Sequence, residues 1–115
     1  MMKRELHTDS VNTLLDRLSQ EHELFYFQMI SRTPKEVYEN CGIIRFYDSL
    51  WEYFQYKENL DKEHVNACLK ESRILPALYN LYLKYEHFKI GTWDEIEELL
   101  DKEADIWKQR EKTVL

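Results

Sequence analysis

The chain has 115 residues, of which 43% are hydrophobic and 33% charged, a balance that fits one folded domain and excludes a disordered tail. Two glycines and two prolines are about a third of average usage, and this scarcity favours helices. Because Gly42 and Gly91 are the only glycines, the sequence excludes a Gly-rich dinucleotide-binding fingerprint and a phosphate-binding loop.

The sequence also predicts a cytoplasmic protein. Near its middle, the longest uncharged stretch runs only from Ile74 to Leu83, whereas a membrane helix needs about 20 residues. The first nine residues lack the apolar centre of a signal peptide, and we expect them to be a flexible N-terminus. Cys41 and Cys68 stand apart from each other, which is typical of free thiols in a reducing compartment.

The net charge of −6 comes from one segment. Residues 94–105 contain seven acids and one base, while the rest of the chain has equal numbers of acids and bases. Direct binding to nucleic acid needs a basic surface, so this distribution argues against it. It also makes the segment the first candidate for a functional surface.

The first helix is predicted from about Ser10 to Ser31. Its apolar face repeats at helical spacing and consists of Val11, Leu14, Leu15, Leu18, His22, Phe25 and Met29. Leu24, Phe27 and Ile30 fall outside that face, so the C-terminal half of this helix is apolar nearly all round. We therefore expect this half to be enclosed by other helices or by a partner.

A second helix is predicted to start at Thr33, because Pro34 suits the first helical position and Glu36 completes a capping box. Its apolar face changes side at Gly42. Val37, Tyr38 and Cys41 lie on one side before the glycine, and the residues from Ile43 to Phe54 lie on the opposite side. One straight helix would have to bury two opposite faces, so we expect a break or kink at Gly42, with an unbroken central helix as the alternative.

Three further helices are expected. Asp61 is the predicted cap of a helix that extends to about Glu71, and the next helix runs from near Pro76 to Phe88, where Gly91 follows as its C-cap. Thr92 and Glu95 form another capping box, which starts a helix with a basic end at Lys112. No segment alternates as a strand does. The prediction is a single all-α domain over residues 1–115, a compact bundle of five to six helices.

Four acids of the last predicted helix, Asp94, Glu98, Asp101 and Asp105, lie on one side, opposite its apolar face. Such a row is most often only a solvated surface that also suits the helix dipole. The functional alternative is a ridge that meets a basic partner surface, including the nucleic-acid groove of an enzyme.

Three other polar residues fall on apolar faces. Glu103 and Arg110 lie on the apolar side of the last helix, and a buried charge needs a partner, so we expect Glu103 to pair with Arg17, Arg45 or Arg73. His22 is expected to be a core histidine with a buried hydrogen bond.

No cofactor, metal site or catalytic residue is predicted. His64 and Cys68, four residues apart on one helix, are the only pair with ligand spacing, and structural zinc takes four ligands. The four histidines are scattered singly, so no catalytic arrangement can be identified, and an enzyme remains the third choice of function.

Aromatic residues are dense between Phe46 and Tyr56. The simplest interpretation is that they belong to the core. Tyr and Trp are also common at interface hot spots, so a contact surface at Tyr47, Trp51 and Tyr53 is the alternative.

The segments 33–37, 76–79 and 94–100, with the Tyr- and Leu-rich helix after the first of them, resemble an uncharacterised family of small all-helical proteins carried by bacterial phages and mobile elements. The resemblance spans residues 11–107. It implies a genomic context in which small acidic proteins block host defence nucleases by binding them. The sequence thus predicts a non-enzymatic protein that binds a protein partner, such as a basic nucleic-acid enzyme, and neither a membrane nor nucleic acid. The alternative is a small helical homodimer that serves as a regulatory or structural subunit.

Overall fold

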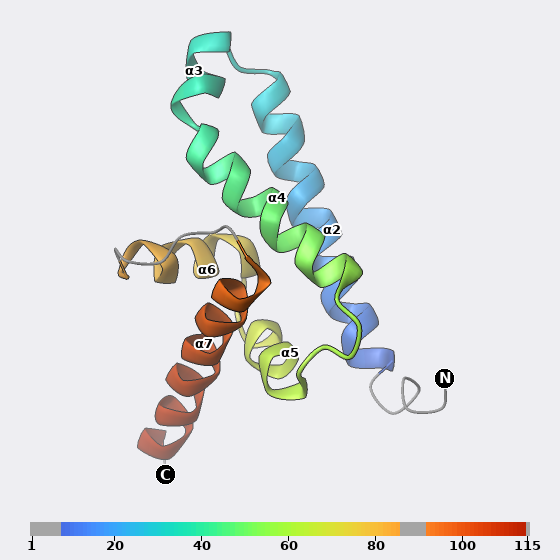
Figure 1. Ribbon diagram of the computed structural model, residues 1–115, viewed down its shortest axis with the longest axis vertical. Coiled ribbons are helices and arrows are strands. Elements are labelled where there is room, and N and C mark those ends of the chain that lie inside the picture. The colour runs from blue at the N-terminus through green and yellow to red at the C-terminus, as the bar shows by residue number, and fades with distance from the viewer. Residues whose placement is uncertain (1–7, 86–91, 115) are drawn as a thin grey trace.

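The computed structural model describes residues 8–85 and 92–114, and these residues form six helices and no strand (Figure 1). The predicted all-α fold is therefore confirmed. The helices are α2 (Thr8–Ile30), α3 (Pro34–Glu39), α4 (Cys41–Tyr56), α5 (Lys62–Leu69), α6 (Ile74–Leu83) and α7 (Trp93–Val114). In Figure 1, α2 and α4 run side by side as a long arm with α3 at its tip, and α5, α6 and α7 pack at the other end.

One hydrophobic core joins these helices. α2 contributes the side chains of Leu14 and Leu18, which lie on its predicted apolar face. α4 contributes five side chains, because it packs against α2, α6 and α7. Burial of this apolar area supplies the main stabilisation. The core members are Leu14, Leu18, Phe46, Tyr47, Leu50, Tyr53, Phe54, Val65, Cys68, Ile74, Leu75, Leu78, Leu81, Ile96, Leu99 and Leu100.

Two charged side chains of α2 fasten the α5–α6 turn. The Glu21 carboxylate accepts hydrogen bonds from the backbone N–H groups of Ile74 (2.9 Å) and Leu75 (2.8 Å), which replaces the side-chain cap that α6 lacks at its own N-terminus. One turn earlier, the Arg17 guanidinium donates to the carbonyls of Leu69 (3.0 Å), Glu71 and Ser72 (3.2 Å). α2 thus binds both the backbone N–H groups and the backbone carbonyls of this turn.

The predicted break is present between α3 and α4, but it lies at Asn40 and not at Gly42. Asn40 has φ −100° and ψ 11°, its backbone N–H donates to Glu36 and Val37, and its Nδ2 donates to the Glu36 carbonyl at 2.7 Å. An Asn side chain competes for backbone groups in this way and so ends a helix. The predicted start at Thr33 is confirmed, because Thr33 and Glu36 form the full capping box.

Gly42 lies in the first turn of α4 with no positive φ, and a Cβ built on it would meet nothing within 4 Å. Gly42→Ala should therefore raise the free energy of unfolding by about 0.5–1 kcal/mol, because alanine loses less backbone entropy in a helix. Urea unfolding followed by circular dichroism measures this change. A destabilised variant would show that the break depends on the glycine after all.

The most apolar segment, α6, differs from its prediction at both ends. It begins at Ile74, so Pro76 lies in the first turn, where a missing N–H costs no helical bond, and it ends at Leu83 rather than at Phe88. Phe88 and Gly91, like most of the expected flexible N-terminus, lie outside the described residues. At its start α2 already includes Thr8 and Asp9. None of the helices in residues 8–85 and 92–114 combines the length and the hydropathy that crossing a bilayer would require.

Candidate interaction surfaces

α7 presents one buried and one exposed side. It starts as predicted, with the Thr92 hydroxyl accepting from the Glu95 backbone N–H at 3.3 Å. Its inner side buries Ile96, Leu99 and Leu100 in the core, and α5 is its main neighbour. The core therefore fixes the rotation of α7 about its axis and turns the opposite side to solvent.

We call Asp94, Glu98, Asp101 and Asp105 the acidic ridge. All four side chains are exposed on the outer side of α7. Asp101, however, is already engaged, since its Oδ1 lies 2.6 Å from Nε2 of His64 on α5. The ridge thus has three carboxylates for a partner and one that ties α7 to α5.

His64 is buried, with 6% of its surface exposed. Its Nδ1 has no hydrogen-bond partner in the described part of the chain. Cys68, one turn on, is a fully buried free thiol whose pKa is raised by burial. Within residues 8–85 and 92–114, no three His, Cys, Asp or Glu side chains are placed to hold a metal ion.

Two neighbouring carboxyl groups lie between α7 and the α5–α6 turn, that of Glu103 buried and that of Glu71 half-buried. Glu103 has 3% of its surface exposed, and the Trp107 indole N–H donates to its Oε2 at 3.3 Å and to Oε2 of Glu71 at 3.1 Å. The expected pairing of Glu103 with Arg17, Arg45 or Arg73 is wrong: Arg17 is used by backbone carbonyls, and Glu103 meets a second carboxyl group instead.

Burial, then hydrogen bonding to Glu71, raises the pKa of Glu103 to about 8. Glu103 therefore keeps its proton near neutral pH. The proton allows Glu103 to donate a hydrogen bond to Glu71. Arg110, which was predicted to share the apolar stripe, instead stacks at the surface on the Trp107 ring, with 4.5 Å between its guanidinium carbon and the ring centroid.

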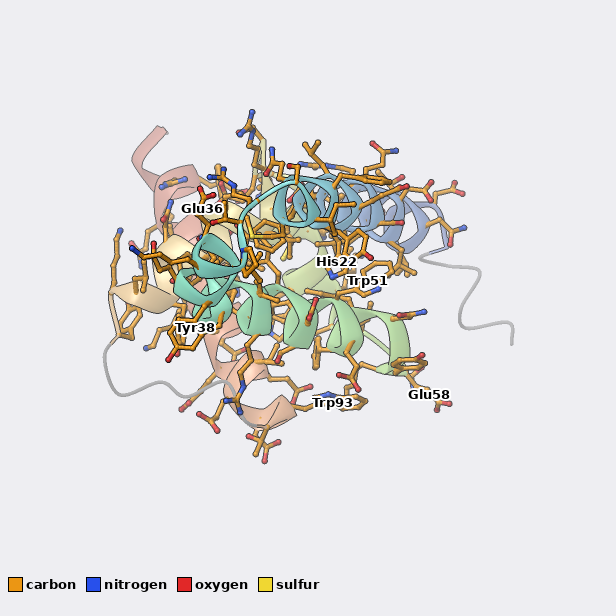
Figure 2. The ribbon with its side chains drawn as sticks, turned by 90° about the horizontal axis from the view of Figure 1, so that it is seen from above. His22, Glu36, Tyr38, Trp51, Glu58 and Trp93 are labelled. Atoms are coloured by element: carbon orange, nitrogen blue, oxygen red, sulfur yellow. The ribbon has the colours of Figure 1, made fainter. Side chains whose placement is uncertain are left out.

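The aromatic residues of α4 belong mainly to the core. Tyr47 and Tyr53 are 5% and 1% exposed, so the structure does not support them as contact residues. The Tyr53 hydroxyl donates to Glu97 at 3.1 Å. Trp51 is half-buried and stacks on His22, whose Nε2 lies 2.7 Å from Asp48 Oδ1 (Figure 2). His22 has a hydrogen-bond partner, but the expected buried bond inside the core is wrong, because His22 lies at the edge of the core and its bond to Asp48 is exposed.

An exposed apolar patch occurs in the half of α2 that was expected to be enclosed by other helices or by a partner. On the outer side of α2, Leu24, Phe27 and Ile30 are 61%, 55% and 59% exposed, and no helix of the described chain covers them. We call these three residues the α2 patch. Tyr38 on α3, which was assigned to a buried face, is 79% exposed and points outward in Figure 2.

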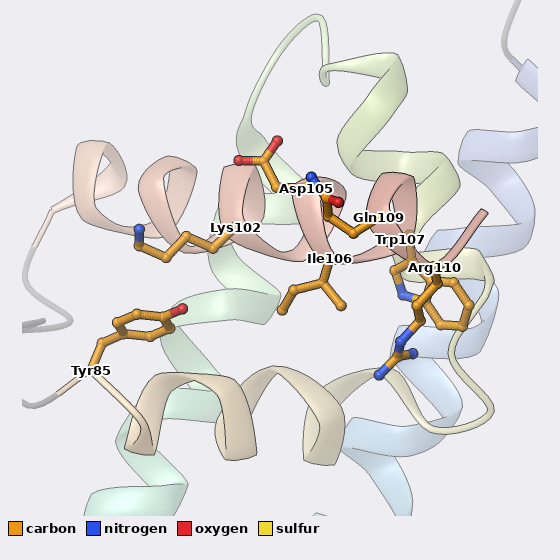
Figure 3. Close-up of a pocket in the computed structure, with 7 residues that line it drawn as sticks. All are labelled: Tyr85, Lys102, Asp105, Ile106, Trp107, Gln109 and Arg110. Atoms are coloured by element: carbon orange, nitrogen blue, oxygen red, sulfur yellow. The ribbon is translucent and has the colours of Figure 1, made fainter. Parts of the chain in front are cut away.

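A groove of about 800 Å³ runs between the end of α6 and α7 (Figure 3). Its wall contains two cation–aromatic contacts, Lys102 over Tyr85 at 4.9 Å and Arg110 over Trp107. Lys102 is the only base in the acidic segment, and this contact turns it toward α6. The outer side of α7 therefore keeps its negative charge.

Comparisons of the chain with models of protein families, with curated proteins and with solved structures give no match. The resemblance to a family from phages and mobile elements stays a prediction that rests on the sequence segments given above.

Proposed function

We propose that this protein acts by stoichiometric binding to a basic protein surface and that the acidic ridge is its contact. The observation that carries the proposal is the concentration of the chain's formal net charge in residues 94–105 of α7, whose outer side exposes Asp94, Glu98 and Asp105. Acids that serve only the helix dipole are needed only in the first turn. Glu98 and Asp105 lie beyond that turn.

The rigidity of the ridge supports recognition rather than solvation alone. α7 is fastened on its inner side by the core and at its flanks by Asp101–His64 and by Lys108 with Glu63 at 2.8 Å. A partner would therefore meet a helix that is already held in place, so that little backbone entropy is lost on binding. From Asp94 to Asp105 the ridge is about 17 Å long, at 1.5 Å per residue.

A row of fixed negative charges of this length suits a groove that holds a nucleic-acid backbone. We therefore propose a DNA- or RNA-processing enzyme as the partner, in the form of a host defence nuclease such as a CRISPR effector or a restriction enzyme. The protein would compete with nucleic acid for the groove, without catalysis of its own.

Displacement of labelled duplex DNA from purified CRISPR effectors and restriction endonucleases tests this function. The variant D94N/E98Q/D105N neutralises the ridge but leaves Asp101 on His64. The matched control D16N/E52Q/E58Q removes the same charge from exposed positions elsewhere. Wild type and control should displace DNA, and the ridge variant should need at least about tenfold more protein, since rim charges steer association.

All three proteins should show similar melting temperatures, because exposed substitutions usually change stability by about 0.5 kcal/mol or less. A ridge variant that competes as well as the wild type would contradict the ridge as the contact. A wild-type protein that displaces DNA from none of these enzymes would contradict the proposed partner class.

A further inference from the structure

The outer side of α2 is divided along its length. Its N-terminal part is polar, with Asp16, Gln20 and Glu23 exposed, and the α2 patch follows toward the C-terminus. Phe27 lies at the middle of the patch, with Leu24 and Ile30 three residues away on either side. α2 also forms an outer edge of the molecule (Figure 1), so a flat or helical partner can reach this side along its whole length. Exposed apolar clusters rimmed by polar groups mark interaction sites.

We propose that the α2 patch is the interface between two copies of this chain, which pack their α2 helices antiparallel about a twofold axis at Phe27. This proposal is independent of the acidic ridge, which lies on α7. In a twofold interface each residue meets its symmetry mate or exchanges partners with it. With the axis at Phe27, the two Phe27 rings meet each other, and Leu24 of each copy meets Ile30 of the other.

The charges next to the patch support this antiparallel register. Glu23 lies at one end of the patch and Arg32 at the other end, in the turn that follows α2. In the antiparallel pair, Glu23 of one copy lies near the C-terminal end of α2 of the other copy, from which Arg32 follows. A parallel pair would place Glu23 beside Glu23 and Arg32 beside Arg32. Opposite charges at opposite ends therefore select a second copy in the antiparallel direction.

Arg32 can accept this second contact. Within its own chain it makes one hydrogen bond, from Nη1 to Glu36 Oε2 at 3.3 Å, and its side chain is 48% exposed. A guanidinium carries five N–H donors, so the others can bind a carboxylate of the second copy. A membrane surface is a poorer occupant, because Asp16 and Glu23 beside the patch would be repelled by anionic lipid headgroups.

The small area of the patch sets the strength of the dimer. Three apolar side chains and the polar residues of about three helical turns bury less than the roughly 800 Å² per partner of a standard interface. We expect a dissociation constant of about 10–500 µM, so monomer and dimer exchange in the concentration range of ordinary biophysical work.

Sedimentation velocity of the full chain from about 10 µM to about 1 mM tests the proposal, since this range spans the expected dissociation constant. The wild-type mass should rise toward that of a dimer. F27E should weaken dimerisation at least about tenfold, because it places two like charges at the twofold axis. The matched control L83E adds the same charge at a residue that is 55% exposed on α6, and it should dimerise as the wild type does.

A charge exchange tests the register. E23R and R32E should each weaken the dimer about fivefold or more, because each brings like charges together, and E23R/R32E should restore wild-type dimerisation within about twofold. All replaced side chains are exposed, and circular dichroism checks that the variants keep their helices. A wild type that stays monomeric at about 1 mM, or an L83E variant as weak as F27E, would overturn the interface. A double variant no better than its singles would overturn the antiparallel register.

Discussion

Replacing Glu103 by glutamine should make the protein progressively more stable than the wild type as the pH rises. The difference in unfolding free energy between E103Q and wild type should grow by about 2–5 kcal/mol between pH 5 and pH 9. The cause is the raised pKa of Glu103, about 8 in the folded protein against an ordinary value of 4.5. Glutamine has nearly the same shape, keeps a donor for Glu71 and an acceptor for the Trp107 N–H, and cannot ionise.

The direction follows from proton binding. Between these two pKa values the folded wild type keeps a proton that the unfolded chain has lost, so rising pH favours the unfolded state by up to about 1.4 kcal/mol per pH unit. Above the folded pKa the penalty is complete. Glutamine has no such proton to lose, so the unfolding free energy of E103Q does not fall with pH for this reason.

Urea unfolding at several pH values between 5 and 9 measures the effect. E98Q is the control, because it removes an exposed carboxylate from the same helix and should follow the wild type. Parallel pH profiles for wild type and E103Q would mean that Glu103 is ionised in the folded protein throughout this range, contrary to its burial beside Glu71.

Trp107→Ala should be the second large effect, a loss of about 3 kcal/mol in unfolding free energy, at the low end of the range for a truncated Trp because this one is half-buried. The substitution removes the indole N–H that both Glu71 and Glu103 accept. It also removes the ring that Arg110 stacks on at 4.5 Å and Lys70 approaches at 5.9 Å.

Trp107→Phe separates the hydrogen bond from the packing. It keeps most of the ring and should lower the free energy of unfolding by about 1–2 kcal/mol, because the two carboxyl groups lose their hydrogen-bond donor. Because the indole hydrogen bond lowers the pKa of folded Glu103, W107F should raise that pKa and extend the loss of stability with rising pH to higher pH values. Chemical unfolding of both variants across the same pH range measures this. Equal stability and an unchanged pH profile for W107F would contradict the bridging role of the indole.

Local sequence signals predicted the helix starts well. Thr33 and Thr92 with their glutamates, and Asp61, which accepts from the Glu63 and His64 backbone N–H groups, act within four residues of the chain. Their geometry depends on nothing distant. A break before α4 is also predictable, since a change of apolar face is visible in the sequence. The prediction placed it at Gly42, whereas the side chain of Asn40 closes the preceding helix.

The contacts of the candidate site could not be predicted, because they join residues far apart in the chain. Asp101 meets His64 across 37 positions, and Glu71 meets Trp107 across 36. A helical pattern shows that Glu103 faces inward, yet it does not show which group of α5 or the following turn it meets. Likewise, the spacing in α4 could not show which aromatic residues lie in the core and which are free to contact a partner. How much of that helix is buried depends on its neighbours α2, α6 and α7.

The central claim is that the α7 ridge meets a basic protein surface, and the salt dependence of the association rate tests it most directly. Stopped-flow association with a nuclease from which the protein displaces DNA should slow steeply as salt rises from about 50 to about 500 mM, because screening weakens steering by exposed charges. D94N/E98Q/D105N should associate at least about tenfold more slowly at low salt and show a shallow dependence, while D16N/E52Q/E58Q should stay close to the wild type. Equal rates for wild type and a folded ridge variant at every salt concentration would contradict the claim.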